Sequence, residues 1–197
     1  MSDPFQEAVE ALANGGLVVV PTDTVYGVAA RPDLPEATAR VFAAKGRPRD
    51  LTLPVLAADA EAAGLAGALD ERALSLALRF WPGPLTLVVP RTETSTPWDL
   101  GEGGDTVGLR VPDHRRTQAL LTETGPLAVT SANRSGEPTP PDCDGVKAAL
   151  GDAVEVYVCD DPRPGGPPST VLDLTGPEPR ILRQGALDRE TLLAPLR

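Results

Sequence analysis

Three cationic side chains lie within five residues of one another. Lys45, Arg47 and Arg49 surround Pro48, which stiffens the segment and favours an extended backbone at Arg47. A lysine can act as a point charge on a phosphate, and arginines grip phosphate oxygens through paired N–H groups. The segment therefore predicts a clamp for a triphosphate. A solvated helix end, whose cations complement the helix dipole, is the alternative.

A polar loop, Ser131–Gly136, supplies hydroxyl, amide and glycine groups directly after a predicted strand. Ligands commonly bind at strand ends of α/β sheets, and the backbone N–H groups of such a loop could cradle a phosphate. An ordinary polar turn built with asparagine and glycine is the alternative. The spacing of a Walker loop occurs nowhere in the sequence, so this loop is not a P-loop.

Arg110 interrupts an otherwise apolar run that predicts a strand. Because a charge is costly to bury unpaired, this arginine either holds a carboxylate or phosphate or lies at an exposed edge beside an acidic residue. Asp23, in a polar loop after the first predicted strand, could act as a base, although turn or capping aspartates are commoner. His114 has no second histidine or cysteine near it, and we assign it no chemistry.

The composition limits the classes of partner and compartment. A formal net charge of −10 opposes non-specific attraction to nucleic acid, so any phosphate site must be local. Cys143 and Cys159 are too far apart in sequence for a metal knuckle or redox pair, which favours structural thiols. No apolar run approaches the ~18–20 residues that cross a bilayer, and the acidic N-terminus is unlike a basic leader, so we expect a cytoplasmic protein.

Alternating strands and helices must position these residues. The hydrophobic patterns predict strands at 17–20, 53–57, 85–89, 106–111, 127–130, 154–159, 170–174 and 180–182, and helices at 5–12, 35–44, 59–80 (two), 113–124, 144–150 and 188–193. Long connections suit crossovers, whereas the short 174–180 link suits an antiparallel neighbour. The prediction is one α/β domain over residues 1–197, with a twisted mixed sheet and flanking helices.

Six ordered motifs together resemble the YrdC/TsaC family of threonylcarbamoyl-AMP synthases. The motifs are Pro21–Gly27, Lys45–Pro48, Trp81–Thr86, Val107–Pro112, Ser131–Gly136 and Ser169–Asp173. The resemblance implies a single YrdC-like domain with a basic concave cavity. It also implies that L-threonine, bicarbonate or CO2, and ATP are converted to threonylcarbamoyl-AMP and pyrophosphate, and that the product serves N6-threonylcarbamoyladenosine formation in tRNA through a separate transferase complex.

The resemblance further implies a role for each matching residue. Lys45, Arg47 and Arg49 would meet the triphosphate, with Mg2+ bridging its oxygens, and the first two would be catalytic through charge neutralisation. The rest of the nucleotide site would be Thr106, Ser131, Asn133, Thr139 and Arg183. Threonine would be bound by Thr22, Arg110 and Ser169, with Arg110 holding the carboxylate.

Leu56 stands where many family members have a histidine, which resembles the short bacterial branch. The sequence ends at Arg197, so the resemblance implies the short form without the extra C-terminal domain of longer relatives, and site closure is expected to depend on loops such as 91–105 or 161–168. Two other functions stay open. A carbamoyl-transfer domain of the hydrogenase-maturation type is disfavoured because no acylphosphatase or zinc-knuckle segment is present. A double-stranded RNA-binding module is disfavoured by the net charge, although a local basic cavity could still touch tRNA.

Overall fold

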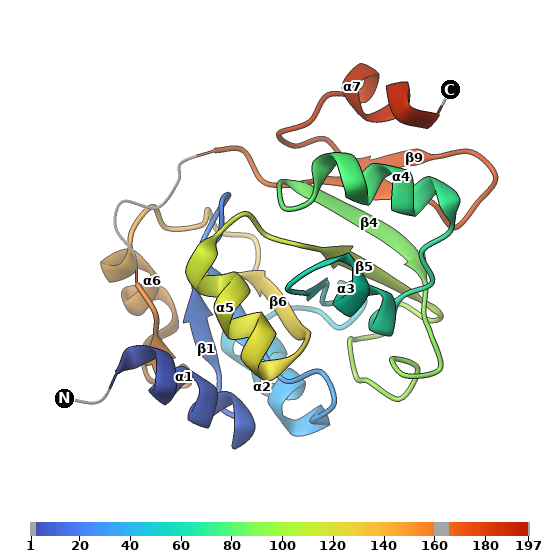
Figure 1. The fold of residues 1–197 in the computed structure, drawn as a ribbon. Coiled ribbons are helices and arrows are strands. Elements are labelled where there is room, and N and C mark those ends of the chain that lie inside the picture. Colours follow the sequence, from blue (N-terminus) through green and yellow to red (C-terminus); the bar gives the residue numbers. More distant parts are fainter. Residues whose placement is uncertain (1–2, 160–165, 197) are drawn as a thin grey trace.

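A computed structural model describes residues 3–159 and 166–196 (Figure 1). In these residues the strands form one nine-stranded sheet in the order β7-β1-β2-β6-β3-β5-β4-β8-β9. The strands are β1 (Val18–Val20), β2 (Gly27–Ala30), β3 (Val55–Leu56), β4 (Leu85–Pro90), β5 (Thr106–Arg110), β6 (Leu127–Ser131), β7 (Val156–Tyr157), β8 (Thr170–Asp173) and β9 (Arg180–Arg183). The α-helices are α1 (Pro4–Ala13), α2 (Pro35–Lys45), α3 (Ala60–Ala66), α4 (Glu71–Phe80), α5 (Arg115–Thr124), α6 (Cys143–Leu150) and α7 (Arg189–Leu193).

The sheet is mixed, which confirms the predicted fold class. Strand pairs β1–β7, β3–β5 and β4–β8 are parallel, and the remaining pairs are antiparallel. The short link after β8 does lead to an antiparallel neighbour, β9. The strand β2 was not predicted, because its Gly-Val-Ala-Ala sequence has neither the alternation nor the β-branched content of a typical strand.

Helices cover both faces of the sheet around β1. Val18 and Val20 pack with Leu12 of α1 and Leu120 of α5, whereas Val19 belongs to the cluster that contains the apolar residues of α2 and α6. Since side chains alternate along a strand, the two clusters lie on opposite faces. Figure 1 shows α1 and α5 side by side in front of this part of the sheet. Strand β1 is therefore buried on both faces, as its continuous valine run predicts.

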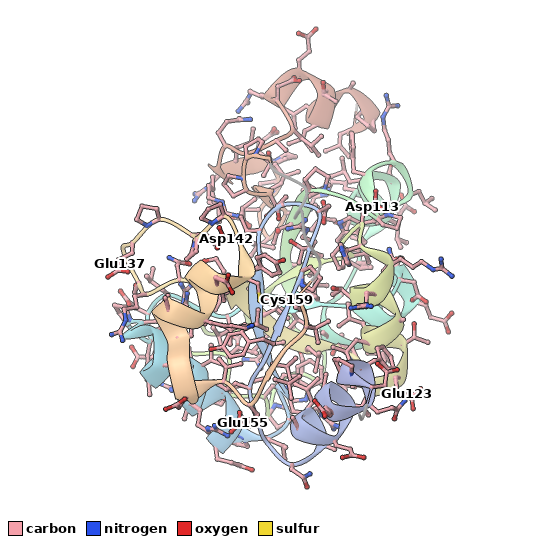
Figure 2. All side chains as sticks on the ribbon, turned by 90° about the vertical axis from the view of Figure 1, so that its left-hand side faces the viewer. Asp113, Glu123, Glu137, Asp142, Glu155 and Cys159 are labelled. Atoms are coloured by element: carbon pink, nitrogen blue, oxygen red, sulfur yellow. A yellow bond between two sulfur atoms is a disulfide. The ribbon has the colours of Figure 1, made fainter. Side chains whose placement is uncertain are left out.

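Cys143 and Cys159 form a disulfide that joins the first residue of α6 to the segment after β7. Their Cα atoms are 5.8 Å apart, and Figure 2 shows Cys159 beside α6. The interpretation of these residues as structural thiols is therefore wrong. The sequence separation of 16 residues gave no sign of the pairing, because the two positions meet only when α6 packs beside β7.

Reduction of this disulfide should destabilise the protein. A closed loop of about 15 residues restricts the unfolded chain by roughly 3 kcal/mol, so the free energy of unfolding should fall by about that amount when the bond is reduced. Urea unfolding with and without a phosphine reductant measures the change. A double variant, Cys143→Ser with Cys159→Ser, should show no reductant dependence. Equal wild-type stability in both conditions would contradict the bond.

Candidate functional site

Strands β4, β5 and β8 have one buried face and one face that is partly open. Leu87, Leu109 and Leu172 point into the core. Of the residues that alternate with them, Val88, Gly108 and Val171 are partly exposed, whereas Thr86 and Arg110 are buried. The register places Val88 opposite Gly108 and Thr86 opposite Val171. We call this surface the open face; its residues are Thr86, Val88, Thr106, Gly108, Arg110 and Val171. Two site residues predicted from the sequence, Thr106 and Arg110, lie on this face. A third, Arg183 of β9, pairs in register with Val171 of this face.

Arg110 ends β5 and is 6% exposed. Its Nε donates to the Gly83 carbonyl oxygen at 3.0 Å, its Nη1 to Thr24 Oγ1 at 3.0 Å, and its Nη2 to Asp23 Oδ1 at 2.5 Å. A guanidinium carries five N–H donors, so one N–H on each terminal nitrogen is left over from these bonds. Two such donors match the two oxygens of a carboxylate.

Thr22 belongs to the same loop as Asp23 and Thr24, the two residues whose side chains contact Arg110. Its hydroxyl donates to the Val25 carbonyl oxygen at 2.5 Å, accepts from the Thr24 and Val25 backbone N–H groups, and meets Thr24 Oγ1 at 3.1 Å. Thr24 is in turn the partner of Arg110 Nη1. Thr22 therefore fixes the shape of the turn that holds the arginine.

Ser169 and Arg183 meet at the β8 and β9 end of the open face. Arg183 Nη2 donates to the Ser169 hydroxyl at 3.0 Å and to its carbonyl oxygen at 2.9 Å. The Ser169 hydroxyl also lies 2.9 Å from Thr86 Oγ1, in β4. Thr86 was not among the predicted site residues, although this buried threonine closes the Trp81–Thr86 motif. Its position in that motif was the available signal.

Lys45 connects the end of α2 to the loop after β6. Its ammonium donates to the carbonyl oxygens of Ser131 and Asn133, and more weakly to Asn133 Oδ1 at 3.4 Å. The Ser135 N–H returns a hydrogen bond to the Lys45 carbonyl oxygen at 2.8 Å, and Thr139 Oγ1 donates to Asn133 Oδ1 at 3.4 Å. The structure thus brings Lys45, Ser131, Asn133 and Thr139 together, and their nucleotide-binding roles stay predictions.

Gly46 makes this connection possible. It follows Lys45 directly and adopts a left-handed conformation with φ 57°, which ends the helix and redirects the chain toward Arg47. A side chain at this position would be strained. The turn allows the ammonium to reach the 131–136 loop while the arginines continue along another path.

Like charges act on one another across the site. Burial lowers the pKa of Arg110, and the Arg183 cation lowers it further, while the Asp23 carboxylate raises it. Burial also lowers the pKa of Arg47, which Asp50 raises and Arg183 lowers. Burial and the Arg47 cation lower the pKa of Lys45 to about 8. Arg183 therefore lies within electrostatic reach of both Arg47 and Arg110, and the group would be stabilised by an anion.

Two predicted residues lie less centrally. Arg49 pairs with Asp99 and stacks over the Phe42 ring at 4.7 Å, so it ties the basic segment to the connection between β4 and β5. Thr106 lies on the open face but starts β5, whereas Arg110 ends it. In the part of the chain that the structure describes, no side-chain hydrogen bond or ion pair joins either residue to Lys45, Arg110 or Arg183. Their nucleotide-binding roles stay predictions.

The described residues limit what else the site can contain. Within 3–159 and 166–196, no group of three histidine, cysteine, aspartate or glutamate side chains is arranged to hold a metal ion. No helix in those ranges has both the length and the apolar character needed to cross a bilayer. A direct acidic cage for a divalent cation is therefore absent from this part of the chain.

The family model for Sua5, YciO and YrdC proteins, described as "Telomere recombination", matches residues 10–185. The chain belongs to this family. A Mycobacterium tuberculosis (strain H37Rv) protein is 44% identical over 186 residues, which cover 94% of this chain and 85% of that protein. The Bacillus subtilis threonylcarbamoyl-AMP synthase is 37% identical over 196 residues, covering 98% of this chain but 57% of its own length.

A solved family structure gives a spatial comparison. The crystal structure of P. abyssi Sua5 complexed with L-threonine superposes with a TM-score of 0.90 at 35% identity. The match covers 100% of this chain and 58% of the P. abyssi chain. This chain thus spans somewhat more than half the length of the Bacillus and Pyrococcus relatives. The fold predicted from the six motifs is confirmed.

The lowered pKa of Lys45 predicts a pH dependence of ATP binding. Protonated lysine attracts the polyanion, so affinity should be nearly full about one pH unit below 8 and should fall as the lysine loses its proton around and above about 8. The dissociation constant should rise by up to roughly tenfold per pH unit between about pH 8 and about pH 9.5. Calorimetry with ATP measures this slope, which Lys45→Ala should abolish and Lys147→Ala should keep. A flat wild-type profile would count against the prediction.

Proposed function

We propose that this chain is an L-threonylcarbamoyladenylate synthase. It forms threonylcarbamoyl-AMP and pyrophosphate from L-threonine, bicarbonate or CO2, and ATP, and is thus a nucleotidyltransferase that supplies tRNA N6-threonylcarbamoyladenosine formation. The observation that carries the proposal is the position of Arg183, within reach of both the carboxylate-binding Arg110 and the phosphate-binding Arg47. A synthase that joins an amino acid to a nucleotide needs these two kinds of anion side by side.

The amino-acid end of the site contains Arg110, Thr22 and Ser169. The two remaining N–H groups of Arg110 bind the threonine carboxylate as a pair. Ser169 presents its hydroxyl beside this position, held by Arg183 and Thr86. The relative crystallised with L-threonine supports an amino-acid ligand for the same fold.

The nucleotide end contains the charges of Lys45 and Arg47, with Arg49 at its border, and Arg183 lies between this end and Arg110. A phosphate oxygen can replace the 3.4 Å bond from Lys45 to Asn133 Oδ1 at little cost, because that bond is the longest of the three. The loop with Ser131, Asn133 and Thr139 then borders the nucleotide, together with Thr106. Mg2+ would be held by phosphate oxygens and water, which suits an ion that keeps several of its waters.

The proposed chemistry depends on positioning. The threonine amine captures CO2 as a carbamate, a carbamate oxygen attacks the α-phosphate, and pyrophosphate leaves. Holding both reactants on one rigid sheet makes the attack effectively intramolecular, and fixed cations neutralise the charge of the leaving group. The proposal takes residues 1–197 as one cytoplasmic domain that passes its product to a transferase complex, with tRNA touching at most a local basic surface.

A pyrophosphate assay tests this function. With ATP, bicarbonate and L-threonine, the wild type should release pyrophosphate only when threonine is present. Lys45→Ala should raise the KM for ATP by about tenfold to a hundredfold, as expected when a charged hydrogen-bonding group is lost. Lys147→Ala removes the exposed second lysine and should match the wild type. No threonine-dependent pyrophosphate from the wild type would reject the proposal.

Arg110→Lys separates the two ends of the site. Lysine keeps the charge but cannot form the paired bonds to a carboxylate, so the KM for threonine should rise at least about tenfold while the KM for ATP changes little. Arg115→Lys, on the exposed surface of α5, is the matched control. Steady-state kinetics with each substrate varied gives both constants. Equal increases in the two KM values would contradict the assignment.

A further inference from the structure

We propose that Asp23 is a specificity-determining residue that makes the amino-acid end of the site accept a singly charged carboxylate and reject a doubly charged phosphate. This inference rests on the proposed function. In this role, Asp23 acts neither as a general base nor as a helix cap.

Asp23 is held rigidly against Arg110. Its Oδ1 accepts from Arg110 Nη2 at 2.5 Å and from the Asp113 backbone N–H at 3.0 Å. The Asp23 and Arg110 side chains are only 15% and 8% exposed. These two hydrogen bonds and the low exposure hold the Asp23 side chain in one rotamer. Its negative charge therefore stays next to Arg110 when a ligand binds.

The other cations of the site lack such a partner. Lys45, Arg47 and Arg183 donate to backbone carbonyl oxygens, and no ion pair is found for them among the described residues. Arg47 has only electrostatic contact with Asp50. The charges of the site are thus distributed unequally. Within the described ranges, the cations at the Lys45 and Arg47 end have no ion-pair partner, whereas at the other end the Asp23 carboxylate neutralises Arg110.

This asymmetry assigns each ligand to its end. Around Arg110, the charges of Arg110, Arg183 and Asp23 leave one net positive charge. A carboxylate neutralises that charge, and the two remaining N–H groups of Arg110 bind it. A phosphate dianion would leave excess negative charge beside the Asp23 carboxylate, and such like-charge contacts are costly when partly desolvated. The triphosphate of ATP is therefore excluded from the threonine position.

The test compares carboxylate and phosphate binding in the whole enzyme. Asp23→Asn keeps the side-chain shape and an oxygen acceptor but removes the charge. Inorganic phosphate should then become a competitive inhibitor against threonine, and the ratio of the threonine KM to the phosphate inhibition constant should rise at least about tenfold. Asp33→Asn is the matched control, because Asp33 pairs with Arg31 on the surface by the same chemistry. Asp23→Glu should keep the wild-type ratio.

A second measurement needs only the wild type. The phosphonate analogue of threonine, whose phosphonate group is a dianion at neutral pH, should bind at least about tenfold more weakly than threonine and should gain affinity as that group becomes a monoanion in acid. An unchanged ratio in Asp23→Asn, or equal wild-type binding of the phosphonate and threonine, would overturn the role of Asp23. Threonine-dependent pyrophosphate release by the wild type would still stand in that case, so the two proposals fail separately.

Discussion

The site depends on cations that backbone carbonyl groups hold in place and that the carboxylates of the described residues do not neutralise. The exceptions are Arg110, which pairs with Asp23, and the bordering Arg49, which pairs with Asp99. Lys45 donates to the carbonyls of Ser131 and Asn133, Arg47 to Leu51 and Thr52, Arg183 to Ser169, and Arg110 to Gly83. A carbonyl dipole lowers the cost of holding a charge in place but does not cancel its field. The positive potential therefore persists toward an arriving polyanion although the whole chain carries a net charge of −10.

The fold makes this arrangement possible because each of those carbonyls lies at the end of a strand or in a loop next to one. Inside a strand, carbonyl oxygens are used by neighbouring strands; where pairing stops, they are free to accept from side chains. The mixed sheet brings several such ends around one open face. Figure 1 shows α4 covering β4 on the other side, so the buried face supplies stability while the open face is left for ligands.

Much of this could be predicted from the sequence, since the hydrophobic patterns locate seven helices and eight of the strands, and the six motifs contain most of the residues that the structure brings together around Lys45 and Arg110. What could not be predicted depends on tertiary contacts. The alanines of β2 favour no particular structure locally, and its strand exists because β1 and β6 lie on either side. Asp23 resembles a turn aspartate until Arg110 is placed beside it. Arg49 resembles a third clamp residue until Asp99 is seen to hold it.

The strand order also has a consequence for biosynthesis. Strand β8 joins β4 by parallel pairing, Leu85 with Thr170, although the two segments are far apart in the chain. Such distant pairing forms late in folding. The basic segment and the 131–136 loop leave the ribosome well before Ser169 and Arg183, so an unfinished nascent chain contains Lys45 and the loop that it contacts but lacks Ser169 and Arg183. The hairpin of β8 and β9 must therefore be translated before these two residues can join the open face.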